Sequence, residues 1–378
     1  MRMMIIRSIT NNSMQISPKT DGRPHIFKNQ YFIIAVIIVA LIAVLYFFQA
    51  LGTGNPFRRN NSELIKNAKD TIGIKDSLQL NSRPTVLDSV KYDHLLHALN
   101  NGDSSGRWPV KLAYPLPGAI FPFNRVVAFY GNFYSKKMGV LGEYPTDTMF
   151  AKLKVEIKKW QAADSTIPVR PALHYIAVTA QGYPGKGNKY RLRMPNKQID
   201  SVIRMAARIN ALVFLDIQVG QSTVMEEVPL LETYLKMPQV HLGIDPEFSM
   251  KTGKKPGTVI GTMDADDINF TIRYLSNLVK NYQLPPKVLV VHRFTQAMIR
   301  NYKNIKPNSE VQVVIDMDGW GAQSRKLTTY HDYIYREPVQ FTGFKLFYKN
   351  DFREANSRMM TPAEVLKLKP RPVYIQYQ

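Results

Sequence analysis

The sequence lacks cysteine entirely, although it has 378 residues. This absence excludes disulfide bonds, a lipid-modified cysteine and metal sites built from thiolates. Histidine is scarce as well, and the seven residues are scattered, without a paired HxH or HExxH spacing, which disfavours a histidine-based metal site. No internal repeat is present. From the sequence we therefore assign no resident metal ion and no cofactor.

Acidic residues are few compared with basic ones. The chain has 29 Asp and Glu against 50 Lys and Arg, which gives a formal net charge of +21. A protein this basic favours anionic partners. Hydrophobic residues make up 45% and aromatic residues 11% of the chain, so most of it should fold around a sizeable core.

One long run, Tyr31 to Leu51, carries no charge and has about the length that a helix needs to cross a bilayer. The residues around Ala50 make a poor cleavage site, so we expect an uncleaved anchor. Five basic residues and one acid precede the run, which predicts a cytoplasmic amino end and a large extracytoplasmic domain. Without these charges the remainder still carries +17. The predicted parts are a basic tail (1–30), a transmembrane anchor (31–51), a polar, turn-rich linker (52–83) and one domain (84–378).

The domain alternates short apolar segments with segments of helical spacing. Eight apolar segments have the length and composition of buried strands, which predicts an α/β fold with a parallel sheet closed into a (β/α)8 TIM-like barrel. An open doubly wound sheet is the alternative, but no glycine-rich nucleotide-binding turn follows the first strand. The eight segments are residues 126–130, 173–181, 213–218, 241–245, 288–292, 313–318, 341–347 and 373–377.

Apolar stripes predict helices in the first, second and fourth connections, whereas the sixth and seventh look irregular. The fourth helix should begin at Asp264, with Asp267 completing an N-terminal cap. The sequence given ends directly after the eighth predicted strand, so we expect a barrel without the usual last helix. A further amphipathic helix within Thr85 to Asn100 is expected to fill that gap. The stripes are Phe150, Leu153, Ile157 and Trp160; Ile199, Val202, Ile203 and Ala206; and Ile268, Ile272, Leu275 and Val279.

Three of the predicted strands end in carboxylates. A buried strand that ends this way is costly unless its end opens onto water and binds something. Because residues two apart share a face of a strand, these pairs should converge at the mouth of the barrel, with His292 between them. Crowded carboxylates push their pKa values apart and leave one protonated acid beside one ionised base or nucleophile, as glycosidic cleavage requires. The pairs are Asp216 with Gln218, Asp245 with Glu247, and Asp316 with Asp318.

The segment HLGIDPEF, residues 241–248, resembles the acid-x-acid end of strand four in barrel glycosidases. These include the muramidase-type lysozymes and, more loosely, the chitinases. The resemblance implies a glycoside hydrolase in which Glu247 donates the proton and Asp245 is its partner. We place Asp216 and Asp318 with them as candidate catalytic residues.

The sequence departs from both families. The muramidase pattern has an acid at the end of strand one, where FYGNFY offers Tyr130, Asn132 and Tyr134. The chitinase pattern has further aspartates before the pair, where His241 and Gly243 stand.

Further residues at the mouth are expected to bind the substrate. The indole of Trp320 offers a face for a sugar ring. Two basic loops, after strands two and four, favour an anionic glycan or phosphate-bearing polymer. The loops carry Lys186, Lys189, Arg191, Arg193, Lys251, Lys254 and Lys255, and the expected binding residues are Asp316, Gln218, His292, Trp320, Tyr130, Gln181, Lys189 and Arg191.

The leading prediction is thus a membrane-anchored, extracytoplasmic, glycoside-hydrolase-like protein. Its expected partner is a carbohydrate or another envelope polymer, not nucleic acid. Three alternatives remain. A metal-dependent hydrolase could use carboxylates and imidazole, and a barrel phosphodiesterase would need two mouth histidines, although His174 should lie too deep. A non-catalytic glycan-binding protein would explain the missing acid of strand one. The residues of the metal-dependent alternative are Asp245, Glu247, His292 and Asp318.

Overall fold

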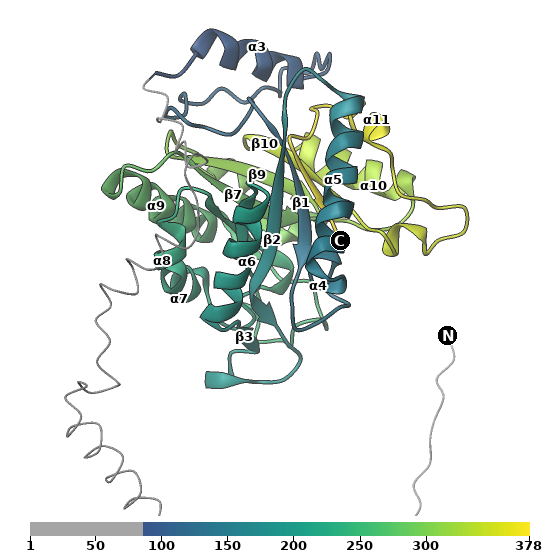
Figure 1. Cartoon of the computed structure of the whole chain (residues 1–378). Coiled ribbons are helices and arrows are strands. Elements are labelled where there is room, and N and C mark those ends of the chain that lie inside the picture. The colour runs from purple at the N-terminus through teal and green to yellow at the C-terminus, as the bar shows by residue number, and fades with distance from the viewer. Residues whose placement is uncertain (1–85) are drawn as a thin grey trace, which may run out of the picture. The chain divides into compact units, whose positions relative to one another are not determined.

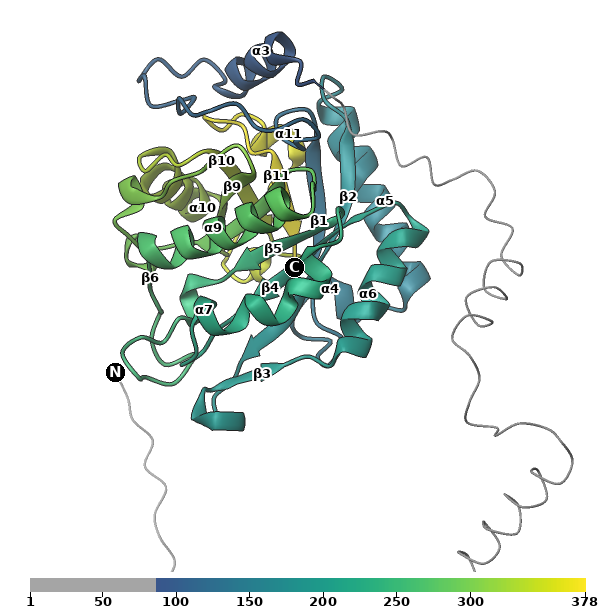
Figure 2. The same cartoon turned by 90° about the vertical axis from the view of Figure 1, so that its left-hand side faces the viewer.

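The computed structural model describes residues 86–378 and places them in a closed parallel barrel (Figures 1 and 2). Of the nine strands in the main sheet, only β3 is antiparallel, which leaves eight parallel strands, and β1 pairs with both β11 and β2 to close the ring. The α/β class, the TIM-like barrel and all eight predicted strands are confirmed. The barrel strands are β1 Arg125–Gly131, β2 Val169–Ala180, β4 Leu212–Ile217, β5 Val240–Ile244, β7 Lys287–Arg293, β9 Val311–Met317, β10 Phe341–Leu346 and β11 Tyr374–Tyr377.

The predicted tail, anchor and linker lie outside the described residues. Within residues 86–378, no helix is both long enough and apolar enough to cross a membrane.

Side chains alternate between the two faces of each barrel strand, because successive residues of a strand point in opposite directions. In β1, Val127 and Phe129 join the large core between strands and helices, whereas Val126 and Ala128 join a smaller cluster inside the barrel. Both faces are buried, which is why the strands read as continuous apolar runs. The residues that follow on the inner face, such as Tyr130, reach the carboxyl end of the barrel.

The three helices predicted from apolar stripes are present as α5 Thr146–Ala163, α6 Asn196–Arg208 and α9 Ala265–Asn281. Asp264 and Asp267 form the expected capping box at the start of α9. The prediction for the sixth connection was wrong: it holds α10 Gln323–Tyr330, which continues as a turn of π-helix through His331–Tyr335. The buried residues of α10 are Lys326 and Tyr330. Because both carry polar groups, the helix shows no apolar stripe in the sequence.

The remaining elements are short. The fifth connection, from β7 to β9, has only 3₁₀ turns and one two-residue strand. The short helices are α4 Val140–Glu143, α7 Val224–Glu227, α8 Glu232–Leu235 and α11 Pro362–Val365, and the short strands are β3 Arg191–Arg193, β6 Met263–Asp264 and β8 Ile299–Arg300.

The helix expected near Thr85 to Asn100 is present as α3 Ser89–Leu99, but its predicted position was wrong. It crosses the end of the barrel at which the strands begin, as Figures 1 and 2 show. Leu96 and Leu99 pack against the cluster inside the barrel, so this helix closes the floor and does not stand beside β11. The helix that contacts β11 is α5, in which the Trp160 side chain donates a 2.9 Å hydrogen bond to the hydroxyl of Tyr377.

Candidate functional site

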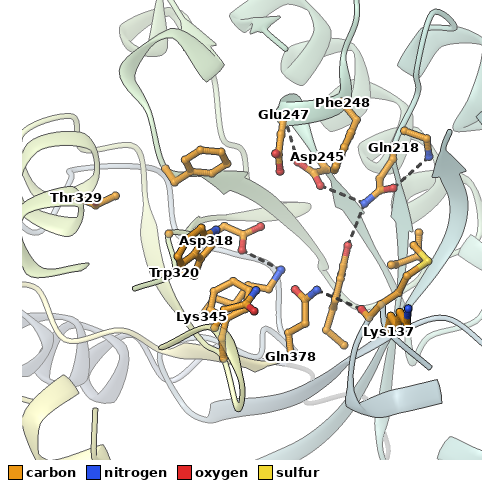
Figure 3. A pocket seen from close by; sticks show the side chains of 18 of the residues that line it. Lys137, Gln218, Asp245, Glu247, Phe248, Asp318, Trp320, Thr329, Lys345 and Gln378 are labelled. Atoms are coloured by element: carbon orange, nitrogen blue, oxygen red, sulfur yellow. Dashed lines mark hydrogen bonds and ion pairs between the residues drawn. The ribbon is translucent and has the colours of Figure 1, made fainter. Parts of the chain in front are cut away.

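A pocket of about 560 Å³ opens at the carboxyl ends of the barrel strands. Its volume falls in the range typical of small-ligand sites, roughly 300–1,000 Å³. Figure 3 shows side chains from several strand ends around it. Six of the predicted site residues line this pocket: Glu247, Asp245, Asp318, Gln218, Tyr130 and Trp320.

Glu247 and Asp245 stand at the end of β5, where the strand passes into a 3₁₀ turn. The Oδ1 atom of Asp245 accepts the Glu247 backbone N–H at 3.1 Å, and its Oδ2 atom accepts from the Gln218 amide at 3.4 Å. Asp245 is therefore a buried residue that fixes the turn. Burial, with Glu247, Asp216 and Asp318 nearby, raises the pKa of Asp245 well above its usual range despite the opposing effect of His292.

The Glu247 carboxyl group is freer. Within residues 86–378, no hydrogen bond holds its carboxyl oxygens, and the side chain is half-buried in the pocket wall. Burial and the charge of Asp318 raise the pKa of Glu247 to about 7, although Lys345 and His292 act in the opposite direction. At neutral pH a large share of this group is thus protonated and able to donate a proton.

Asp318 has the opposite character. Its Oδ1 atom lies 2.9 Å from the Lys345 Nζ atom, and its Oδ2 atom lies 3.1 Å from the His292 Nδ1 atom. Burial alone would raise the pKa of Asp318, but Lys345 and His292 lower it below its usual value. The pocket therefore combines a carboxyl group with a pKa near neutrality and a carboxylate that stays ionised.

Asp216, Asp316 and His292 form a layer below the pocket and do not line it. All three are fully buried. The Oδ2 atom of Asp216 accepts a 2.8 Å hydrogen bond from the Tyr130 hydroxyl, which separates it from the pocket. The sequence grouped Asp216 with the catalytic acids and the other two with the substrate-binding residues, but none of them has access to a ligand in the pocket. Alternation alone could not show how deep each of them lies.

Electrostatics in this layer follow from close pairing. Burial alone would raise the pKa of Asp216, but the imidazoles of His292 and His174 hold it far below its usual range. Burial alone would lower the pKa of His292, but Asp216, Asp316 and Asp318 raise it well above its usual range. Burial lowers the pKa of His174 to about 4 and raises that of Asp316 to about 6.

Trp320 is at the mouth and is 41% exposed. The guanidinium groups of Arg325 and Arg353 lie 5.8 Å and 5.5 Å from its ring centre. These cations lie over the ring and bring positive charge to the pocket rim.

Besides Asp316 and His292, three more predicted binding residues do not line the pocket. Gln181 donates a side-chain hydrogen bond to the Tyr183 carbonyl. Lys189 lies 3.5 Å from Glu226, and Arg191 lies 2.8 Å from the buried Glu227. Basic residues of the loop after β2 thus form ion pairs with acids of the neighbouring α7 segment. Sequence spacing could not reveal this pairing.

Other pocket residues escaped the sequence analysis. Lys345 is 3% exposed, and its Nζ atom lies 4.1 Å from the Tyr130 ring centre. The signal for it was a lysine on the inner face of the apolar strand FTGFKLF. Phe248, Phe294 and Gln378 also line the pocket. Phe248 ends the 3₁₀ turn after β5, and Phe294 and Gln378 directly follow β7 and β11, so the period of two of a strand no longer applies to them.

The histidine arrangement bears on the alternatives. His174 lies deep, as expected, and neither it nor His292 lines the pocket. No family model matches this chain, and no curated protein is similar to it by sequence. The likeness of HLGIDPEF to the glycosidases therefore depends on that motif and on the barrel alone.

Proposed function

We propose that this protein is a glycoside-hydrolase-like enzyme, anchored in the membrane by residues 31–51, that acts outside the cytoplasm on an envelope or extracellular glycan. The observation that carries the proposal is the pair formed by Glu247 and Asp318. The first is a carboxyl group with a pKa of about 7 and the second a carboxylate held ionised by Lys345, and both line one pocket. Such a division of two carboxyl groups suits cleavage of a glycosidic bond.

In this proposal Glu247 protonates the leaving oxygen of the glycosidic bond. Its raised pKa supports this role, because a general acid works best when its pKa is close to the working pH. Asp318 supplies the negative charge that an oxocarbenium-like transition state needs, as base or nucleophile. Asp245 positions Glu247 through the hydrogen bond to its backbone N–H.

The substrate inferred from the pocket is a short stretch of glycan with acidic groups. Phe248, Phe294 and Trp320 provide apolar surface for sugar rings, whereas Lys137 and Arg325 bring positive charge to the same pocket. Aromatic surface with a few polar groups is the usual composition of sugar-binding clefts.

The test offers soluble neutral and acidic polysaccharides to the purified chain and measures turnover as the release of reducing ends. We expect Glu247→Gln to lower kcat by about 10²–10⁴-fold, because it removes the positioned acid. Asp266→Asn is the matched control, since this exposed acid in the first turn of α9 lies outside the pocket. Wild-type turnover by Glu247→Gln would eliminate the assignment.

A non-catalytic glycan-binding protein is the second candidate, and a specific observation favours it. At the end of β1, where the muramidase pattern has an acid, Tyr130 points to Asp216 and does not supply a carboxylate. Saturable glycan binding by the wild type without any turnover, unchanged in Glu247→Gln, would favour this candidate over the enzyme.

A further inference from the structure

Three fully buried side chains from three strands converge below the pocket: His174 of β2, Asp216 of β4 and His292 of β7. The Nε2 atoms of both histidines lie 3.4 Å from the same atom, Asp216 Oδ1. One ligand atom from each residue lies within 4.8 Å of the other two. This cluster is distinct from the Glu247–Asp318 pair that carries the proposed function.

The atoms that face one another in this cluster are unsatisfied. His174 Nε2, His292 Nε2 and Asp216 Oδ1 have no hydrogen-bond partner, although they are buried. Charge-assisted N–H···O bonds are normally about 2.7–2.9 Å long, so separations of 3.4 Å are weak substitutes. Buried polar atoms without a partner are rare in folded proteins and call for an explanation, such as a bound ion.

The neighbouring strand leaves room at this point. Gly243 of β5 faces the cluster, and a Cβ atom added to it would overlap both Asp216 Oδ1 and His174 Nε2. A side chain of any other residue would therefore fill the space between the ligand atoms.

The outer nitrogens of both histidines lie near oxygen atoms that can orient the rings, but of the two only His174 Nδ1 makes a hydrogen bond, and His292 Nδ1 has none. His292 Nδ1 lies 3.1 Å from an Asp318 oxygen and 3.5 Å from an Asp316 oxygen. His174 Nδ1 lies 2.6 Å from the Tyr374 hydroxyl. Metal-binding histidines almost always donate their second N–H to a carboxylate or another oxygen, which leaves the first nitrogen free for the ion.

We propose that His174 Nε2, Asp216 Oδ1 and His292 Nε2 bind one divalent transition-metal ion of the zinc type. Ligand atoms about 2.0–2.2 Å from a tetrahedral ion lie about 3.4 Å apart, which matches the two separations from Asp216 Oδ1. Two imidazoles and one carboxylate select such an ion over Mg²⁺ or Ca²⁺, which prefer oxygen ligands.

Because the site lies below the pocket, its inferred role is to hold the residues at the base of the pocket in place. The other Asp216 oxygen accepts from Tyr130, and His292 contacts Asp318. Both of these partners line the pocket, so the ion would position them without contacting the substrate.

The experiment uses the full chain without a histidine tag, purified in mild detergent and stripped with a chelator. Zn²⁺, Co²⁺, Mg²⁺ and Ca²⁺ are then offered singly, and bound metal per chain, melting temperature and the visible spectrum of the Co²⁺ form are measured. We expect one tightly bound Zn²⁺ or Co²⁺ ion per chain, a rise in melting temperature with these two ions only, and the intense absorption of four-coordinate Co²⁺.

Variants locate the ion. His174→Gln and His292→Gln should weaken Zn²⁺ binding by at least about tenfold, and Gly243→Ala should do the same by filling the space. His241→Gln is the matched control, because this buried histidine on β5 bonds the Val288 backbone N–H and is not part of the cluster. A stripped wild-type chain that binds neither ion, or Zn²⁺ binding that survives His174→Gln and His292→Gln unchanged, would overturn the proposal. The wild-type titration decides the matter even where a variant fails to fold.

Discussion

Glu247 and Asp318 differ in pKa because of what surrounds each carboxyl group. Asp318 contacts one cation at 2.9 Å and one imidazole at 3.1 Å, whereas Glu247 is partly buried beside Asp318 and has no such contact. Desolvation and a like charge disfavour ionisation of Glu247, while opposite charges favour ionisation of Asp318. Two residues of the same chemical type therefore acquire different protonation states within one pocket.

The raised pKa of Glu247 makes the stability of the protein depend on pH. Below pH 4.5, Glu247 is protonated in both folded and unfolded chains; above it, the unfolded chain loses the proton first. Stability should therefore fall as the pH rises through about 7, and Glu247→Gln should remove about 1–3 kcal/mol of this fall, allowing for partial exposure. Urea unfolding of the wild type and of Glu247→Gln at acidic and alkaline pH measures this difference in stability. Parallel pH curves for the two chains, or an equal effect of Asp266→Asn, would contradict the raised pKa.

Arg191, which the sequence alone assigned to ligand binding, forms a buried ion pair with Glu227. Glu227 is fully buried and contacts Arg191 at 2.8 Å and Arg193 at 2.6 Å. Removing one partner of such a pair leaves an uncompensated buried charge. The two arginines thus stabilise the β3 region, and their joint replacement would damage the fold as well as any binding.

We expect Arg191→Leu to lower the free energy of unfolding by about 3 kcal/mol, and Arg191→Leu with Glu227→Leu to recover part of the loss. Chemical denaturation of the full chain measures both. Lys189→Leu is the control, since Lys189 and Glu226 are exposed by 37% and 47%, and an exposed pair contributes at most about 1 kcal/mol. If Arg191→Leu and Lys189→Leu lowered the free energy of unfolding equally, burial of Glu227 would not make its ion pair more important for stability than an exposed one.

At the scale of elements, α3 closes the amino end of the barrel. Leu96 and Leu99 pack on the inner cluster, and the Leu99 carbonyl accepts a 2.8 Å hydrogen bond from the Arg371 N–H. Asn101 also accepts from the Arg371 guanidinium at 2.8 Å. This helix therefore belongs to the domain, at a different place from the one expected.

Uncovering this end should destabilise the barrel. A chain that begins at Ser105 should melt at a lower temperature than one that begins at residue 84. Within the full chain, Leu96→Ala with Leu99→Ala should cost about 2–4 kcal/mol, less than two fully buried leucines. Val86→Ala with Val90→Ala is the matched control, because these residues are 77% and 81% exposed. Thermal melting compares them, and equal melting temperatures of the two double variants would place α3 outside the cooperative fold.

At the scale of the whole molecule, the net charge is +21, but only some of the basic side chains are free to attract an anionic ligand. Arg191, Arg193 and Lys251 are neutralised by nearby acids. Lys186, Lys254 and Lys255 are exposed in loops that follow barrel strands, so they are the better candidates to attract an anionic polymer toward the mouth.

Affinity for an acidic oligosaccharide should fall by about tenfold between low and high salt, since exposed charges are screened beyond about 10 Å at 0.1 M ionic strength. Replacing Lys186, Lys254 and Lys255 with Ala should weaken binding and reduce this salt dependence. Lys91→Ala with Lys111→Ala, exposed lysines of the segment that contains and follows α3, is the control. Calorimetric titration with neutral and acidic ligands of equal length tests it: equal, salt-insensitive affinity for both would exclude an anionic preference.

Much of the barrel was readable from the sequence because local physics specifies it. Apolar runs of strand length gave all eight barrel strands, and helical stripes gave α5, α6 and α9. The period of two placed Tyr130, Gln218, Asp245, Glu247 and Asp318 at the mouth, where the pocket contains them. Those inferences need only the geometry of a strand and the direction of a parallel sheet.

Only the tertiary structure decided depth and pairing. His174 and Asp216 are 42 residues apart in the chain, yet meet at 3.4 Å because β2 and β4 are neighbours in the barrel. Lys345 reaches Asp318 from an adjacent strand, and Arg191 turns to Glu227 and away from the pocket. Which polar group lies under another, and which cation compensates which acid, depends on the register and packing of distant segments, and no local pattern in the sequence records these.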